Sequence, residues 1–152
     1  MLGQSVRDNF ALPNLDTLSK FGLVDGRRER KAFGRHIEML RIKVSNQRQQ
    51  ARHLSGGNQQ KLVLAKWLER DCEVLFFDEP TRGIDVGARH EIYLLMNDLA
   101  ARGKAIVMVS SELPEVLGMA DRILVMHDGR ITGELLNGPD VTQEQVMRLA
   151  MA

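Results

Sequence analysis

The sequence contains a single cysteine, Cys72, among its 152 residues. One cysteine excludes an internal disulfide and is typical of a reducing compartment. No apolar run approaches the roughly 20 residues that a membrane-spanning helix needs. The N-terminal stretch carries Arg7 and Asp8 where a signal peptide would have its apolar part. These absences predict a cytoplasmic protein, one that can still dock onto a membrane partner.

Aromatic residues are also scarce, at 5% of the chain, and the formal net charge is only +1. The charge is unevenly distributed. Residues 1–53 carry eleven Lys/Arg against five Asp/Glu, a net of +6, and residues 54–152 carry ten against fifteen, a net of −5. A basic segment can contact nucleic acid or lipid, but aromatic residues do not alternate with these charges as a single-strand binder requires. We interpret the basic segment as a solvated helical face and expect no nucleic-acid partner.

The first third of the chain has the periodicity of helices. Ser5 is placed to cap a short helix over residues 6–10, which Pro13 would interrupt. Residues 27–42 show apolar side chains at helical spacing with charges between them. The polar stretch 47–52 has no apolar period and predicts a loop.

From Leu54 onward the pattern alternates strands and helices. Continuous apolar runs predict buried strands, the first of them buried on both faces as in a parallel sheet. Asp128-Gly129 is a hairpin signal, and Thr142 with Gln145 forms a capping-box pattern. The expected strands cover residues 74–77, 105–109, 122–126 and 131–135, and the expected helices cover residues 58–70, 88–101 and 111–118, with one more after Thr142.

This alternation predicts an α/β fold with a parallel sheet core. The helical part before it predicts a separate subdomain. We place the boundary at residue 70, giving a helical subdomain over 1–70 and an α/β part over 71–152. The helix after Gly57 is expected to belong to both parts.

The first motif with chemical meaning runs from Leu54 through Ser55-Gly56-Gly57-Asn58. Paired glycines at a helix start let backbone N–H groups approach an anion closely, and the helix dipole favours negative charge there. Ser55 adds a hydroxyl donor. Taken alone, the pattern is explained more simply by a helix N-cap without a ligand.

The second motif is the apolar run Val74–Phe77 followed by Asp78-Glu79. Carboxylates at the C-terminal end of a parallel strand lie at the sheet edge where ligands bind in open α/β folds. One acid can hold Mg²⁺, and its neighbour can orient or deprotonate an attacking water. An acidic turn after a buried strand is the plain structural alternative.

Together, in this order and at this spacing, the two motifs resemble the ABC ATPase family. The finer resemblance is to the second nucleotide-binding domain of ribose-, xylose- and galactoside-type sugar importers, carried by residues 57–61, 80–88 and 110–116. The resemblance implies ATP and Mg²⁺ as cofactors and a partial P-loop NTPase fold. It assigns the signature residues Ser55, Gly56, Gly57 and Asn58, the metal-binding Asp78 (through water), the catalytic Glu79 and the D-loop Asp85.

The sequence departs from the family pattern in three places. It contains no Gly-x-x-x-x-Gly-Lys-Ser/Thr loop to wrap phosphates. Ser111 stands at the position of the switch histidine and cannot carry its charge. Asn58 replaces a common glutamine. From the first departure we expect a partial or truncated chain that does not hydrolyse ATP by itself.

The resemblance also implies partners. These are a second nucleotide-binding domain that holds ATP against the signature, a transmembrane permease and, indirectly, a sugar-binding protein. The expected place is the inner face of the cell membrane, as a peripheral subunit. Two alternatives remain open on the sequence: a non-transport ABC-type ATPase acting on RNA or DNA, and a non-catalytic module that pairs with a complete ATPase.

Overall fold

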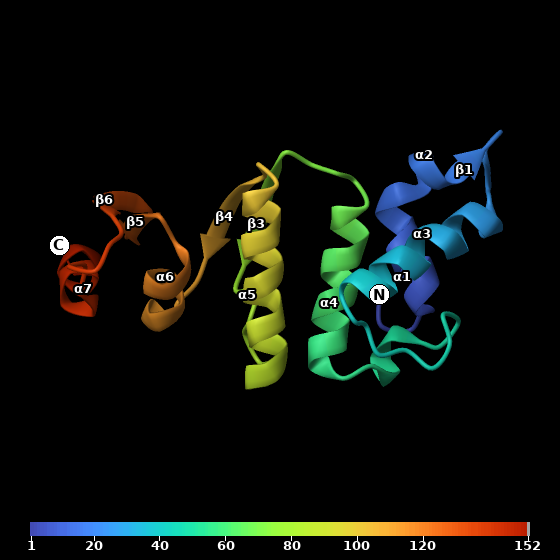
Figure 1. Ribbon diagram of the computed structural model, residues 1–152, viewed down its shortest axis with the longest axis horizontal. Coiled ribbons are helices and arrows are strands. Elements are labelled where there is room, and N and C mark those ends of the chain that lie inside the picture. Colours follow the sequence, from blue (N-terminus) through green and yellow to red (C-terminus); the bar gives the residue numbers. More distant parts are fainter. Residues whose placement is uncertain (152) are drawn as a thin grey trace. The chain divides into compact units, whose positions relative to one another are not determined.

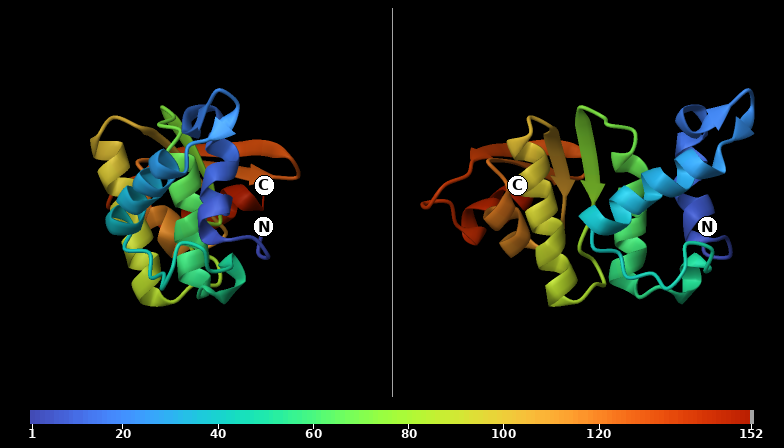
Figure 2. Two further views of the ribbon diagram at one scale, coloured as in Figure 1. Left: turned by 90° about the vertical axis from the view of Figure 1, so that its right-hand side faces the viewer. Right: turned by 45° about the vertical axis from the view of Figure 1, so that its right-hand side comes forward.

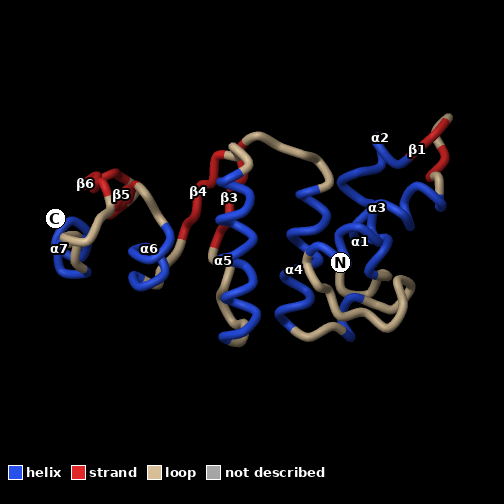
Figure 3. Tube along the Cα trace, in the orientation of Figure 1, coloured by secondary structure: helices blue, strands red, loops and turns tan. Residues whose placement is uncertain are grey.

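The computed structural model describes residues 1–151 and divides the chain into two compact units. The first comprises residues 1–75 and 81–106, and the second comprises residues 76–80 and the chain from Val107 onward. Figures 1 and 3 show the helices and strands of each unit. No helix in the described part is long and apolar enough to cross a bilayer. The boundary expected at residue 70 stays a prediction.

The first unit is mainly helical. Its helices are α1 (Val6–Ala11), α2 (Leu15–Leu18), α3 (Gly26–Met39), α4 (Gly56–Leu68) and α5 (Val86–Ala101), with single 3-10 turns at Leu12–Asn14 and Ala51–His53. A short hairpin joins α2 to α3, and each of its strands, β1 (Ser19–Lys20) and β2 (Leu23–Val24), has two residues. The sequence did not predict this hairpin. The expected loop over 47–52 is shorter than predicted, because a 3-10 turn begins at Ala51.

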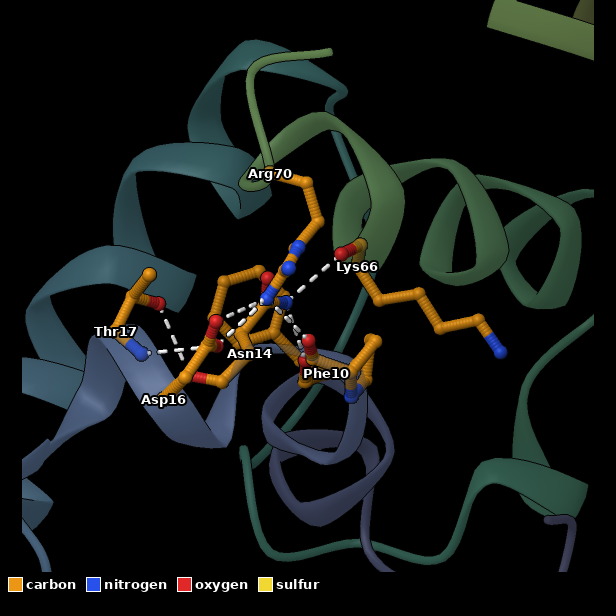
Figure 4. A network of polar contacts seen from close by, with 7 residues as sticks. Phe10, Asn14, Asp16, Thr17, Lys66 and Arg70 are labelled. Carbon is orange, nitrogen blue, oxygen red and sulfur yellow. Dashed lines mark hydrogen bonds and ion pairs between the residues drawn. The ribbon is translucent and has the colours of Figure 1, made fainter.

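The core of this helical unit forms around aromatic side chains. The fully buried rings of Phe10 and Phe33 stack with centroids 4.9 Å apart, which packs α1 against α3. The side chain of Asn14 is also fully buried, and its Nδ2 donates to the carbonyl oxygens of Phe10 (2.9 Å) and Lys66 (2.8 Å). Buried amides need such partners, so Asn14 fixes the end of α1 against α4 (Figure 4).

Charged side chains join the helices at the periphery of the core. Arg70 Nη1 lies 2.6 and 2.8 Å from the two carboxylate oxygens of Asp16, and this bond from Arg70 is the main cause that lowers the pKa of Asp16 (Figure 4). Lys61 of α4 is paired with Glu91 of α5. Burial raises the pKa of Glu29, although Arg7 Nε lies 3.1 Å from its carboxylate and opposes the shift.

Strands β3 (Val74–Asp78) and β4 (Ala105–Val109) form a two-stranded sheet. The bonds Ala105 N to Glu73 O and Glu79 N to Val109 O, both 2.9 Å, run in the order of a parallel pair. The expectation that the first strand is buried on both faces is wrong. Phe77 is buried, but Val74 is 50% exposed and Phe76 75% exposed. The physical reason is that β3 pairs with β4 alone in the described chain, and two strands do not make a two-sided core.

The second unit contains α6 (Leu113–Met119), β5 (Arg122–His127), β6 (Arg130–Leu136) and α7 (Gln143–Ala150). The predicted turn is confirmed, because Asp128 and Gly129 have φ of 46° and 73° and join β5 to β6 in an antiparallel hairpin. The predicted capping box at Thr142 and Gln145 is confirmed as well. The third expected strand, β5, pairs with β6 instead of extending the parallel pair. The hydrophobic core of this unit forms around the buried side chains of Ile123, Val125 and Val146.

Candidate functional site

The first candidate feature is the start of α4. Ser55 is its N-cap residue, with an extended backbone (φ −62°, ψ 157°), but its side chain makes no capping bond to the helix. Its Oγ instead accepts a bond from Asn58 Nδ2 at 2.8 Å, and Asn58 Oδ1 accepts from Lys43 N at 2.7 Å. The Asn58 side chain therefore ties the serine to the preceding loop. Because no side chain caps α4, the backbone N–H groups of its first turn are available to an anion.

The two glycines of this motif have different surroundings. Gly56 is exposed, and a Cβ built on it would lie 3.7 Å from the carbonyl oxygen of Gly83, an ordinary contact. Gly57 is buried, and a Cβ there would lie only 2.9 Å from Cβ of Ala88. Gly57 is therefore required for close packing of α4 on α5. The sequence interpretation, which gave both glycines to anion approach, is incomplete at Gly57.

Asp85 lies beside this packing contact. It is the N-cap of α5, and its Oδ1 accepts a bond from Ala88 N at 2.9 Å. A Cβ on Gly57 would also come within 3.8 Å of Asp85 Oδ2. The residue predicted from the D-loop resemblance is thus brought next to the residue predicted from the signature. The N-termini of α4 and α5 are neighbours in the first unit.

A small cavity of about 230 Å³ opens beside the start of α4. Its lining includes Gly56, Gln59, Gln60, Lys66, Arg82 and Gly83. The sequence gave no role to the two cationic side chains of this lining, Lys66 and Arg82. Arg82 follows the second motif and lies within residues 80–88, which carry the family resemblance, and that position was the available signal for it. Lys66 lies on α4 after the two glutamines, and no sequence pattern pointed to it.

The second candidate feature is the acid pair at the C-terminal end of β3, in the second unit. Asp78 is exposed and Glu79 is half-buried. Glu79 has a positive φ of 44°, which a residue with a side chain rarely adopts. Its backbone N donates to Val109 O at 2.9 Å, which holds it in this conformation. Strain of this kind persists only where the surroundings enforce it, and it gathers at functional positions.

Ser111, the residue at the switch position, contacts Glu79 of this acid pair. The backbone N of Ser111 donates to Glu79 Oε1 at 3.0 Å. The bond comes from the main chain, so it does not depend on which side chain occupies position 111. One carboxylate oxygen of Glu79 is held by this bond.

The oxygen donors at the end of β3 fit a magnesium ion that arrives with a nucleotide. Mg²⁺ keeps several waters and is bound by one or two carboxylates together with substrate phosphates. Asp78 and Glu79 provide two neighbouring carboxylates at one strand end. Elsewhere in residues 1–151, as here, no three His, Cys, Asp or Glu side chains gather into a metal-binding group. The donor set therefore suits a cation shared with phosphate oxygens.

The mixed α/β architecture, with a parallel strand pair and flanking helices, is consistent with a partial P-loop NTPase fold. The ABC transporter family model matches residues 2–82, which is more than half of the chain. The chain therefore belongs to the ABC transporter family, as its ATPase component, and nucleotide binding, typically with Mg²⁺, is a property of that family.

The chain is similar to curated proteins whose names describe the import of ribose. The chain is 56% identical over 150 residues to the ribose import ATP-binding protein of Bacillus subtilis, covering 99% of this chain and 30% of that protein. It is 54% identical over 152 residues to the ribose import ATP-binding protein of Clostridium perfringens, again covering 99% of this chain and 30% of that protein. The chain thus spans about a third of the length of these relatives.

Solved structures show the same fold. A dimeric ATP-binding cassette in a post-hydrolysis state, bound to ADP and phosphate, matches with a TM-score of 0.77 and 24% identity, over 91% of this chain and 59% of that one. A nucleotide-free cassette from an ABC transporter matches with a TM-score of 0.73 and 22% identity, over 97% and 58%. These likenesses confirm the predicted partial ABC ATPase fold.

Proposed function

We propose that this chain is the signature-bearing part of the ATP-hydrolysing subunit of a bacterial sugar importer, located at the inner face of the membrane. Identity of more than half of all positions to two ribose import ATP-binding proteins supports this proposal. The observation that carries it is the start of α4, where an exposed Gly56 and an uncapped first turn stand beside Asp85. That geometry suits an anion presented from outside the chain.

In this proposal the N–H groups at Ser55, Gly56 and Gly57 bind phosphate oxygens of ATP held by a second nucleotide-binding domain. Ser55 keeps its hydroxyl hydrogen free to donate, because its oxygen accepts from Asn58. Asp85 positions the start of α5 next to the signature. The resemblance to the family implies that the signature serves the nucleotide held by the partner domain.

Asp78 and Glu79 serve the nucleotide on the chain's own side. ATP would supply the phosphoryl group there, and Mg²⁺ would neutralise its developing charge. Asp78 would hold the cation through water. Glu79 would accept a proton from the attacking water on the carboxylate oxygen that Ser111 N does not hold. Ser111 offers no cationic side chain at this position, so we expect weak hydrolysis on this side.

A chimaera tests the proposal. The equivalent segment of the Bacillus subtilis ribose import ATP-binding protein is replaced by this chain, and ribose uptake is measured in a strain lacking its own copy of that protein. Uptake restored by the chimaera and abolished by Gly56→Asp supports the signature role. A folded, membrane-associated chimaera that supports no uptake contradicts it.

The isolated 152-residue chain gives a second readout. It is expected to show no ATP turnover above that of a Glu79→Gln control. Turnover that the wild-type chain shows and the control lacks would contradict the division of labour between the two sites. A chimaera that pairs with its partner domain without any effect of nucleotide would favour the non-catalytic module.

A further inference from the structure

The hairpin β1–β2 has an unusual turn. Ser19 pairs with Val24 and Lys20 with Leu23, so the loop has two residues, Phe21 and Gly22. Both have positive φ, 52° and 78°, which is the geometry of a type I′ turn. Figure 1 and the right-hand view of Figure 2 show the hairpin projecting beyond α2 and α3.

Phe21 is unfavourable here for two independent reasons. The first position of a type I′ turn favours Asn, Asp or Gly, and a bulky residue at positive φ is an outlier. The ring is also 94% exposed, and Leu23 beside it is 76% exposed. Within the described chain its only ring contact is with Lys20, whose Nζ lies 5.6 Å from the ring centroid. Neither the turn nor the core explains an aromatic residue at this tip.

The tip is bordered by exposed basic side chains. Lys20 precedes it, and α3 begins just after it with Arg27, Arg28 and Lys31, all exposed. Within residues 1–151 none of these four side chains forms an ion pair.

The nearby carboxylates are already engaged. Asp25 caps α3 by accepting from Arg27 N and Arg28 N, and Asp16 is bound by Arg70. The surroundings of the hairpin therefore combine two exposed apolar side chains with four basic side chains that form no ion pair in the described chain.

We propose that the tip formed by Phe21 and Leu23 inserts into the headgroup layer of an anionic lipid bilayer, with the four basic side chains resting on the lipid phosphates. This combination of an apolar point and a basic border is the pattern of interfacial membrane binding. The surface that two side chains on a projecting turn can bury is far smaller than the roughly 800 Å² that each partner buries in a stable protein interface. The inference goes beyond the proposed function, because it concerns a surface remote in sequence from the signature.

Flotation of the full 152-residue chain with lipid vesicles tests the proposal. The chain should float with phosphatidylglycerol-containing vesicles and not with pure phosphatidylcholine vesicles, and about 0.5 M salt should weaken the binding, because charge interactions are then screened beyond roughly 4 Å. Phe21→Asn should reduce the partition coefficient about tenfold or more, since a phenyl group no longer leaves water. Asn suits the turn, so thermal stability should be kept or raised.

Leu136→Asn is the matched control, because Leu136 is 79% exposed but lies at the end of β6 in the second unit. This variant should bind vesicles like the wild type. Equal binding by Phe21→Asn, or wild-type binding without preference for anionic lipid, would overturn the proposal.

A tryptophan at the tip separates lipid from protein contact. In a Trp67→Phe background, which removes the chain's one natural tryptophan, Phe21→Trp should show a blue-shifted emission with protein-free anionic vesicles. A shift that appears only when a permease is present in the vesicles would refute lipid insertion. The chimaera's sugar uptake is scored separately, so failure of one proposal does not decide the other.

Discussion

Replacing Gly57 by alanine should destabilise the protein through a single contact. The new Cβ would lie 2.9 Å from Cβ of Ala88, closer than real Cβ atoms approach. Overpacking of this kind costs about 1–3 kcal/mol, and the better helix propensity of alanine returns up to about 1 kcal/mol. We expect a net loss of about 1–2 kcal/mol, which lowers the unfolding temperature by roughly 2–8 °C for a chain of this size.

The matched variant is Gly56→Ala. Its Cβ would lie 3.7 Å from Gly83 O, so stability should change by less than about 0.5 kcal/mol. Sugar uptake by the chimaera should nevertheless fall, because the methyl group stands where a phosphate would approach. The two neighbouring glycines thus predict opposite outcomes: Gly57→Ala changes mainly stability, and Gly56→Ala mainly function.

A double-mutant cycle decides whether the reasoning on Gly57 is right. Thermal and urea unfolding are followed by circular dichroism for Gly57→Ala, Ala88→Gly and the double variant. Removing the opposing methyl should recover most of the loss, giving a favourable coupling of about 1 kcal/mol. Additive effects, or a Gly57→Ala variant as stable as the wild type, would refute the assignment of Gly57 to packing.

Three further predictions follow from other contacts. Glu79→Gly should raise the unfolding temperature, because glycine adopts the positive φ of 44° without strain, while it removes any hydrolysis on the chain's own side. Ser111→Ala should leave chimaera ATPase activity unchanged, since the bond to Glu79 comes from the backbone, whereas an activity loss would assign a role to the hydroxyl. The bonds from Arg28 N and Arg27 N lower the pKa of Asp25, so Asp25→Ala should lower the unfolding temperature at neutral pH. The difference between variant and wild type should close as pH falls through the lowered pKa, below 3.8. A difference that persists at that pH would contradict the capping role.

Local signals in the sequence predicted the elements whose causes are themselves local. Ser5 caps α1 by accepting a bond from Asp8 N, and Thr142 and Gln145 form the capping box of α7. The turn at Asp128-Gly129 joins β5 to β6. Each depends on residues within a few positions, so the side chain and its consequence can be read together.

The sequence could not predict features that depend on distant neighbours or on strain. Gly57 and Ala88 are 31 positions apart, so their contact is invisible before folding. Phe21-Gly22 is not a usual hairpin signal, and the turn was missed for that reason. The exposure of Phe76 reflects the number of strands beside β3, which an apolar run does not encode.

The family resemblance assigned Glu79 and Ser111 to the site, and the structure shows a hydrogen bond of 3.0 Å from Ser111 N to Glu79 Oε1. The sequence did not indicate this backbone bond, or that Glu79 has a positive φ. The roles given to Ser55, Asn58, Asp78 and Asp85 stay predictions.

Thiol labelling of Ser55→Cys tests the central proposal most directly. The variant is made in a chimaera with Cys72→Ser and no other cysteine, and the labelling rate is measured with ATP, with ADP and without nucleotide. If the start of α4 receives the phosphates of a partner's ATP, labelling slows sharply with ATP only when the partner domain is present. Labelling at one rate in all conditions would contradict the proposed function.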